Sequence, residues 1–228
     1  YMVHERSLYF GSETKFLAAL SGHKPSVNLD HVRRYLVNGY KALYKKPHTF
    51  FADIRELPPS SSAVLTAPEV PQTSTYWSLE HRTQAMSREE AVVGARDHLY
   101  EALRIRLRSD VPLAFCLSGG VDSSALAAIA ALEFNQEVHA FSIVDKDIRY
   151  NESKNIQATV AHLGCDHDII ETDTKDFLGR LERLVAYHDA PVATISYYMH
   201  AFLSEAINQA GYKVSLSGTG ADELFTGY

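Results

Sequence analysis

The sequence predicts an α/β protein, in which a parallel sheet flanked by helices is preceded by part of another domain. From residue 112 onward, short apolar strands alternate with helical segments, a pattern typical of a parallel sheet covered on both faces. The segment from Pro68 to Ser78, with two prolines and several Thr and Ser residues, is the best candidate for a linker. We therefore predict two domains, at residues 1–76 and 77–228.

Four strands and five helices are expected after the linker. Ser87 is followed three residues later by Glu90, a capping-box pattern that predicts the start of a long amphipathic helix. The strands are expected at residues 112–118, 138–144, 166–172 and 213–218. The other helices are expected at residues 123–134, 152–164, 175–187 and 197–210, with a further helical turn after residue 220.

The helices and strands expected in the first domain are shorter than those expected in the second. A strand is expected at residues 8–10 and helices at 16–20 and 29–37, from their apolar spacing. The cluster from Pro58 to Ser62 predicts a turn between two strands.

Composition excludes several classes of protein. The chain has 228 residues, 46% hydrophobic and 22% charged, which is typical of a globular protein. Its net charge is -6, whereas proteins that bind nucleic acid or an anionic membrane surface usually carry a basic patch. Neither is therefore an expected partner. No apolar stretch reaches the ~20 residues needed to cross a bilayer. Cys116 and Cys165 are expected to be free thiols in a reducing compartment, and we expect a cytoplasmic protein. Both ends of the chain look cut, which predicts a fragment of a longer protein.

The stretch "LAFCLSGGVDSSALAAIAA", residues 113–131, predicts a phosphate site. A strand runs into a helix through a turn of glycines and serines, and such a turn directs backbone N–H groups and hydroxyls at an anion. Asp122 at this helix start could be an ordinary capping acid. Beside a phosphate it would need a bridging cation, for which Mg²⁺ is the usual choice. The loop has no lysine, so it is not a G-x-x-x-x-G-K-[ST] loop, and it is not G-x-G-x-x-G either.

A second stretch, "SLSGTGADELFTGY" at residues 215–228, has the same design. An apolar strand ends in Ser217 and two spaced glycines, and Asp222 opens a helical turn. If the two strands are neighbours, Asp122 and Asp222 could hold one magnesium ion between them. The alternative is a surface turn with a capping Asp.

Both loops resemble those of a known family. "SGGVDSS" is similar to the pyrophosphate-binding loop of the ATP-pyrophosphatase superfamily, and "SGTGADELFTGY" resembles the "SGxGADELFGGY" segment of asparagine synthetases. "TFFADIRELPPSSSAVLT", "YNESKNIQATVAHLG" and "HDAPVATISYYMHAFLSEA" are similar to further parts of that family in the same order. The resemblance implies a Rossmann-like ATP-pyrophosphatase domain at residues 77–228. It also implies that residues 1–76 are the C-terminal part of an N-terminal-nucleophile glutaminase domain.

The resemblance implies an ATP-dependent ligase that adenylates a carboxylate, releases pyrophosphate and amidates the product with ammonia from glutamine. Its small-molecule partners would be ATP, aspartate or another carboxylate, and ammonia, and the family leaves a homodimer open. Asp122 and Asp222 would bind Mg²⁺, and Asp189 matches an acidic position near the acceptor, although a plain turn acid is the alternative. The ATP contacts carried over from the family are Leu117, Ser118, Gly119, Gly120, Asp122, Ser123, Ser124, Ile143, Ser217 and Gly218.

The sequence departs from the family at the acceptor and glutaminase positions. Thr219 stands where asparagine synthetases place a glutamate that is implicated in handling the activated intermediate, so no catalytic residue is assigned. Relatives that amidate sugar acids of surface polysaccharides or close β-lactam rings are alternatives, as is a non-catalytic nucleotide-binding relative. The chain as given carries no N-terminal catalytic cysteine, so we do not expect this segment itself to hydrolyse glutamine. His162 and His167 lack metal-ligand spacing and are expected to be solvated or capping residues.

Overall fold

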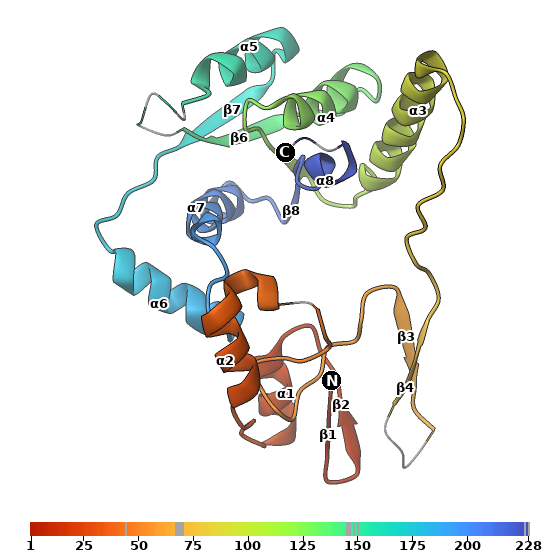
Figure 1. Cartoon of the computed structure of the whole chain (residues 1–228). Coiled ribbons are helices and arrows are strands. Elements are labelled where there is room, and N and C mark those ends of the chain that lie inside the picture. Colours follow the sequence, from red (N-terminus) through yellow and green to blue (C-terminus); the bar gives the residue numbers. More distant parts are fainter. Residues whose placement is uncertain are drawn as a thin grey trace. The chain divides into compact units, whose positions relative to one another are not determined.

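A computed structural model of the chain describes residues 1–43, 45–66, 71–144, 147, 149, 151–225 and 227 (Figure 1). The chain divides into two compact units. The first comprises residues 1–83 and 178–195, and the second comprises residues 84–177 and 196–228. The division thus falls later than the predicted boundary at 76/77, and an internal segment joins the first unit.

The first unit is built on a small hairpin and two helices. Strand β1 (Met2–His4) pairs antiparallel with β2 (Ser7–Tyr9), and α1 (Thr14–Ser21) and α2 (Leu29–Asn38) follow, with a 3-10 turn at Gly39–Ala42. The expected strand and both helices are therefore present, and β1 is an addition. Met2, Leu17 and Ile54 form the core of this unit, with Tyr9 and Phe51 packed against it.

Most of α6 (Phe177–His188) belongs to the first unit because side chains of α1 and α2 hold the segment that follows it. The Asp189 carboxylate accepts hydrogen bonds from Thr14 Oγ1 at 2.7 Å and from the Lys15 backbone N–H at 2.9 Å. Tyr35 donates its hydroxyl hydrogen to the carbonyl of Val192 at 3.1 Å. These contacts span more than 150 residues of sequence, which no local pattern could predict.

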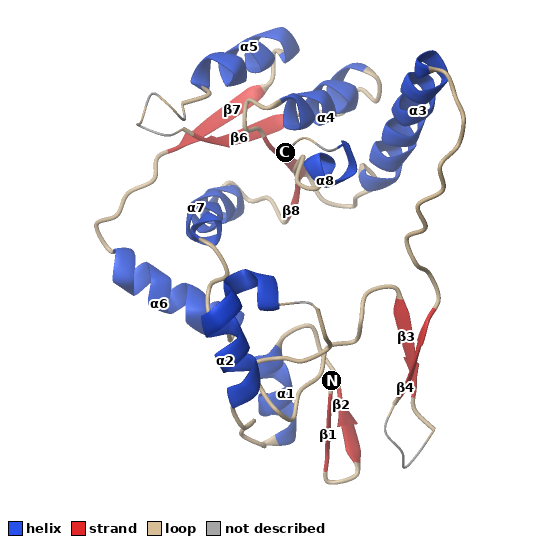
Figure 2. Ribbon diagram, viewed as in Figure 1, coloured by secondary structure: helices blue, strands red, loops and turns tan. Residues whose placement is uncertain are grey.

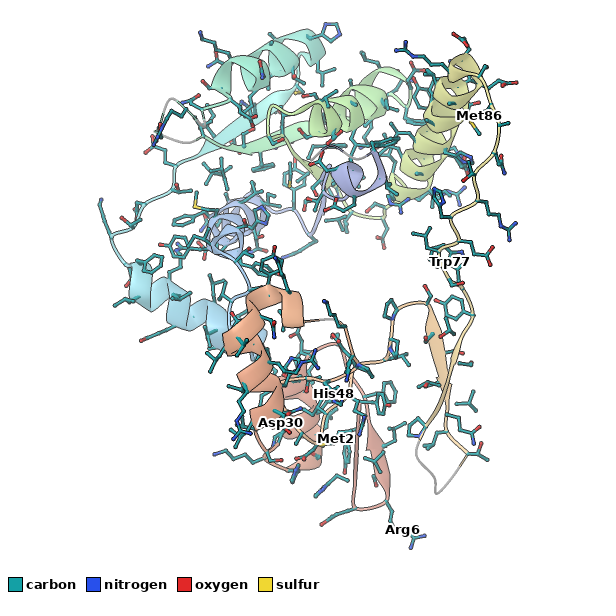
Figure 3. All side chains as sticks on the ribbon, viewed as in Figure 1. Met2, Arg6, Asp30, His48, Trp77 and Met86 are labelled. Atoms are coloured by element: carbon teal, nitrogen blue, oxygen red, sulfur yellow. The ribbon has the colours of Figure 1, made fainter. Side chains whose placement is uncertain are left out.

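The region around residues 49–78 differs from the prediction. The strand expected before Pro58 is represented only by isolated bridges, Val27 to Phe51 and His48 to Arg55. The expected linker contains a strand, β4 (Gln72–Thr75), which pairs antiparallel with β3 (Ser61–Val64). Hydroxyl contacts join the two strands as well, between Ser61 and Thr75 at 3.2 Å and between Ser62 and Ser74 at 3.1 Å. Residues 76–87 have neither helix nor strand, and the exposed Trp77 and Met86 side chains project from them (Figure 3). Of the predicted linker, residues 72–75 are a strand and residues 76–78 have neither helix nor strand, while residues 68–70 lie outside the described residues.

The second unit begins with α3 (Arg88–Arg106), which starts at the predicted capping box. Ser87 Oγ accepts from the Glu90 backbone N–H at 3.2 Å, and the Glu90 carboxylate accepts from the Ser87 N–H at 2.8 Å. This reciprocal pair satisfies two N–H groups that a helix start leaves without intrahelical partners.

All four predicted strands of the second unit form one parallel sheet. They are β5 (Leu113–Cys116), β6 (His139–Ile143), β7 (Asp166–Ile170) and β8 (Val214–Leu216), in the order β7-β6-β5-β8. Figure 2 labels β6, β7 and β8 of this sheet. The chain passes outward from β5 to β6 and β7, and then places β8 on the other side of β5. The strand order therefore reverses between β5 and β8, and in open α/β sheets ligands bind outside the strand ends at such a point.

Helices cover both faces of this sheet. Leu113, Phe115 and Leu117 point toward α4 (Val121–Leu132) and α5 (Ser153–Leu163), where they pack with residues such as Leu103, Ala127 and Ile156. Ala114 and Cys116 point to the other face of the sheet. There Phe141 of β6 and Ile170 of β7 form a second cluster with Ile207, which lies on α7 (Ile195–Gln209). Figure 1 shows α4 and α5 along one face of the sheet and α7 along the other. Within the residues described, no helix has the length and apolar character needed to span a membrane.

We expect Leu113→Ala to lower the free energy of unfolding by about 2–5 kcal/mol, because it removes a side chain that is 4% exposed from the core of the sheet. Leu132→Ala is the matched control, since Leu132 is 58% exposed and an exposed substitution changes stability by about 0.5 kcal/mol or less. Urea denaturation of both variants measures the difference. Equal stabilities would contradict the layer arrangement.

Candidate nucleotide site

The two glycine-containing loops meet because β5 and β8 are neighbours. The strands pair in parallel, with Phe115 opposite Leu216, so their carboxyl ends lie at the same edge of the sheet. Gly218 approaches the start of α4 so closely that a Cβ placed on it would lie 2.9 Å from the Ser123 nitrogen and 3.0 Å from the Asp122 Cβ. The condition set by the sequence, that the second strand should neighbour the first, is met.

Ser123 holds the first loop in its shape. Its side chain is 6% exposed, and its Oγ accepts from the Ser118 N–H at 3.1 Å and donates to the Gly120 carbonyl at 3.2 Å. Ser118 Oγ lies 3.0 Å from Ser123 Oγ and accepts from the Gly120 N–H at 3.3 Å. Gly120 is the N-cap of α4 and provides no side chain to cap the helix, so the first-turn N–H groups remain directed outward. Such N–H groups attract anions.

Gly119 supplies the turn of the loop, with φ at +85°, a conformation that side chains rarely adopt. A Cβ at this position would lie 2.9 Å from the Cβ and 3.1 Å from the carbonyl oxygen of Glu152, just before α5. The absence of a side chain at Gly119 therefore allows the loop to pack closely against the start of α5. It is not among the residues that line the cavity described below.

Residues of the neighbouring strands β6 and β7 hold the loop through hydrogen bonds. Ser142 of β6 is 1% exposed and donates its hydroxyl hydrogen to the Leu117 carbonyl at 2.6 Å. Its oxygen is then free to accept from His167 Nε2 of β7, 3.0 Å away. Burial lowers the pKa of His167, which favours the neutral imidazole. His167 is thus a partly buried strand residue and not the solvated or capping residue that the sequence suggested.

The second loop is also closed by hydroxyls. Ser217 Oγ donates to Thr219 Oγ1 at 2.9 Å and accepts from the Thr219 N–H at 3.3 Å. Gly220 has φ at +101° and turns the chain into α8 (Ala221–Phe225), whose first turn contains Asp222. Thr219 Oγ1 therefore accepts the hydrogen of a neighbouring hydroxyl, and no basic group is seen to activate it within the residues described.

A cavity of about 520 Å³ lies between the loops, the ends of β5, β6 and β8, and α7. The predicted residues Leu117, Ser118, Gly120, Asp122, Ser123, Ile143, Ser217, Gly218 and Asp222 line it, and so does Thr219. Ser124 is predicted for the nucleotide but lies outside the lining, where its Oγ accepts from Thr159 Oγ1 at 3.2 Å. The structure thus brings together most of the predicted contacts, from two segments about 100 residues apart.

Sequence reasoning missed a whole wall of the cavity. The additional lining residues are Cys116, Phe141, Glu152, His200, Leu203, Ser204, Ile207 and Ser215. Four of them lie on α7 at the helical spacing 200, 203, 204 and 207, so a search of that helix for a mixed polar and apolar face could have found them. We call these four residues the α7 wall.

The lining is acidic and rich in hydroxyls. Asp122, Glu152 and Asp222 contribute carboxylates, and neither Lys nor Arg lines the cavity within the part of the chain that the structure describes. Burial raises the pKa of the Cys116 thiol, an effect that a hydrogen bond with Ser215 opposes. Among the described residues, no three His, Cys, Asp or Glu side chains cluster as metal ligands. Two carboxylates beside a phosphate nest fit Mg²⁺, which commonly takes one or two carboxylates and completes its coordination with phosphate oxygens and water.

Asp189 lies in the first unit, and its surroundings are those of a capping acid. Besides its bonds to Thr14 and Lys15, its Oδ2 lies 3.7 Å from Lys15 Nζ. Its φ of +53° places it in a turn after α6. The structure accounts for Asp189 as a residue that fixes the start of α1, and its acceptor role stays a prediction.

The fold and the cavity together define an α/β domain with a glycine and serine loop at the point where the strand order reverses, which is where such sheets bind ligands. The family described as asparagine synthase matches residues 94–228, which is more than half of the chain. The chain therefore belongs to the asparagine synthase family.

Individual relatives are similar over most of this chain. Amidase chyE of Penicillium rubens is 32% identical over 79% of this chain and 30% of its own length. Amidase chry2 of Gibberella zeae is 27% identical over 100% of this chain and 36% of its own length. Asparagine synthetase [glutamine-hydrolyzing] 1 of Bacillus subtilis is 26% identical over 97% of this chain and 34% of its own length. The chain thus spans about a third of the length of these curated relatives.

We expect Gly218→Ala to lower the free energy of unfolding by about 1–3 kcal/mol, because the new methyl group would overlap the backbone of α4 at Ser123. Gly94→Ala is the control. Gly94 lies in α3, where an added Cβ would meet no atom within 4 Å beyond its chain neighbours and its own helix backbone, so alanine should be neutral or stabilise the helix by up to about 1 kcal/mol. Thermal or urea unfolding compares the two, and equal stabilities would contradict the close approach of the loops.

Proposed function

We propose that this chain is the ATP-binding part of an ATP-dependent amidotransferase, a carbon–nitrogen ligase. The observation that carries the proposal is the meeting, around one cavity, of the two loops whose sequences resemble motifs of the family. In the proposed reaction an acceptor carboxylate attacks the α-phosphate of ATP and pyrophosphate leaves. Ammonia derived from glutamine then displaces AMP. The glutaminase identity of residues 1–76 and a cytoplasmic location remain parts of the proposal.

The residues that line the cavity fit a nucleoside triphosphate. The N–H groups at the start of α4 and the hydroxyls of Ser118 and Ser217 would bind phosphate oxygens, as helix starts and hydroxyl-rich loops do. Ile143 and Phe141 provide apolar surface on the same cavity for the adenine. Because the loop is already held by Ser123, the N–H donors at the start of α4 need little rearrangement when the ligand binds, whereas the Ser217 hydroxyl must rotate away from Thr219 to donate to phosphate.

Asp122 and Asp222 would hold Mg²⁺ together with the phosphates. When bound, the ion neutralises phosphate charge and stabilises the leaving pyrophosphate. Without a cation, the two carboxylates would repel the ligand, so nucleotide affinity should depend on magnesium.

The proposed acceptor is a carboxylate, and Thr219 is the residue that leaves the identity of this carboxylate open. Thr219 is neutral where asparagine synthetases have a glutamate, and two relatives that match this chain well are named amidases. We therefore place aspartate and other carboxylates, including sugar acids and β-lactam precursors, as alternative acceptors for the same ATP chemistry.

A second candidate function is nucleotide binding without catalysis, and Thr219 is the observation that favours it. Its hydroxyl oxygen accepts from Ser217, an arrangement that provides no base for proton transfer. In this case the protein would bind ATP and release no pyrophosphate.

The products of ATP cleavage test the proposal. With Mg²⁺, ammonia and a panel of carboxylates, we expect acceptor-dependent release of pyrophosphate and AMP by the full-length protein. Asp122→Asn and Asp222→Asn should reduce that rate by at least ~100-fold, because each removes a proposed metal ligand. Phosphate and ADP as products would refute the proposed reaction, and ATP binding without turnover would favour the second candidate.

Magnesium dependence provides a separate prediction for binding. Calorimetric titration with ATP should show that Asp122→Asn loses about tenfold or more in affinity when Mg²⁺ is present, since a ligand of the ion is gone. Without Mg²⁺ the same variant should bind ATP at least as well as the wild type, because a carboxylate that repels phosphate has been neutralised. Asp110→Asn, at an exposed position outside the cavity lining, is the matched control. A loss of equal size under both conditions would contradict the metal role.

A further inference from the structure

The α7 wall brings an imidazole to the nucleotide cavity, and the inference drawn from it rests on the proposed function. His200, Leu203, Ser204 and Ile207 line the cavity and follow the spacing of one helix face. His200 itself is exposed, so its ring is accessible to a ligand.

The direction of α7 places His200 near the phosphate loops. The helix leads into β8, so the chain runs along α7 toward the amino edge of the sheet and returns along the strand to the carboxyl edge. Ile207, late in the helix, is 7% exposed and packs with Ala114 and Phe141 in the core. His200 lies two turns earlier, toward the carboxyl edge, where both loops lie.

The charges of the lining explain what His200 can contribute. The side chains that line the same cavity include the carboxylates of Asp122 on α4, Glu152 before α5 and Asp222 on α8. Within the described residues, His200 is the lining side chain that can carry a positive charge. The phosphates of ATP are strongly anionic, and an N–H donor with a positive charge makes a charge-assisted hydrogen bond to them.

We propose that His200 binds the phosphates of ATP from the α7 wall, while the loops after β5 and β8 bind them from the ends of the strands. His200 is then a residue of the nucleotide site that neither motif contains. The apolar members of the same wall, Leu203 and Ile207, would contact the rest of the nucleotide.

Calorimetric titration of the intact chain with two probes, ATP with Mg²⁺ and adenosine, tests the proposal. His200→Gln should weaken ATP binding about tenfold and leave adenosine binding within twofold, because adenosine has no phosphates. His200→Lys should keep ATP affinity within about threefold of the wild type, since it restores a cation on a flexible side chain. His98→Gln, an exposed histidine of α3 outside the cavity lining, should bind both probes as the wild type does.

Each other outcome overturns the inference. Unchanged ATP affinity in His200→Gln, while the wild type binds ATP, refutes the role of His200 and leaves the proposed function intact. Equal loss of ATP and adenosine binding assigns His200 to the shape of the cavity, and a His200→Lys variant as weak as His200→Gln removes the charge argument. A wild-type chain that binds neither probe refutes the proposed function together with this inference.

Discussion

The close approach of Gly218 to the start of α4 is the constraint on which the rest of the site depends. A Cβ added to Gly218 would lie 2.9 Å from the Ser123 nitrogen and 3.0 Å from the Asp122 Cβ, so the segment can approach α4 this closely only because it carries no side chain there. That approach in turn requires β5 and β8 to pair in register, so that both loops leave the sheet at the same level. The apolar cores on the two faces of the sheet fix this pairing, because alternate residues of β5 are anchored in different clusters.

A second consequence of the sheet is that the loop is supported in layers. Ser123 orders the loop from within, Ser142 holds the Leu117 carbonyl from the next strand, and His167 contacts Ser142 from the strand after that. Donors that are held in this way are directed at a ligand before it arrives, which is how an enzyme site avoids reorganisation during reaction. The hydrogen bonds run outward from the loop at residues 118–123 through β6 to β7.

Much of the second unit could be predicted from sequence because its determinants are local. The capping box at Ser87, the alternation of apolar strands and helices, and the two glycine loops each depend on a few neighbouring residues. The helical spacing of the α7 wall is visible in the sequence, but its role as a cavity surface is not, since that depends on α7 lying against Phe141. Asp189 shows the same limit, because its carboxylate binds residues of α1 that are more than 170 positions away. Whether a residue contacts a ligand or another helix is decided by such distant partners.

The return of residues 178–195 to the first unit has a consequence for how the protein is made. As the chain is synthesised from its N-terminus, the partners of Thr14 and Tyr35 emerge only after β5, β6 and β7 have been completed. Domains generally fold as units during synthesis, with N-terminal parts first. Here the first unit is interrupted by residues 84–177 and lacks residues 178–195 until that part of the second unit has been synthesised. We therefore expect the two units to complete their folding together. A gene truncated at residue 83 would encode the first unit without the helix that completes it.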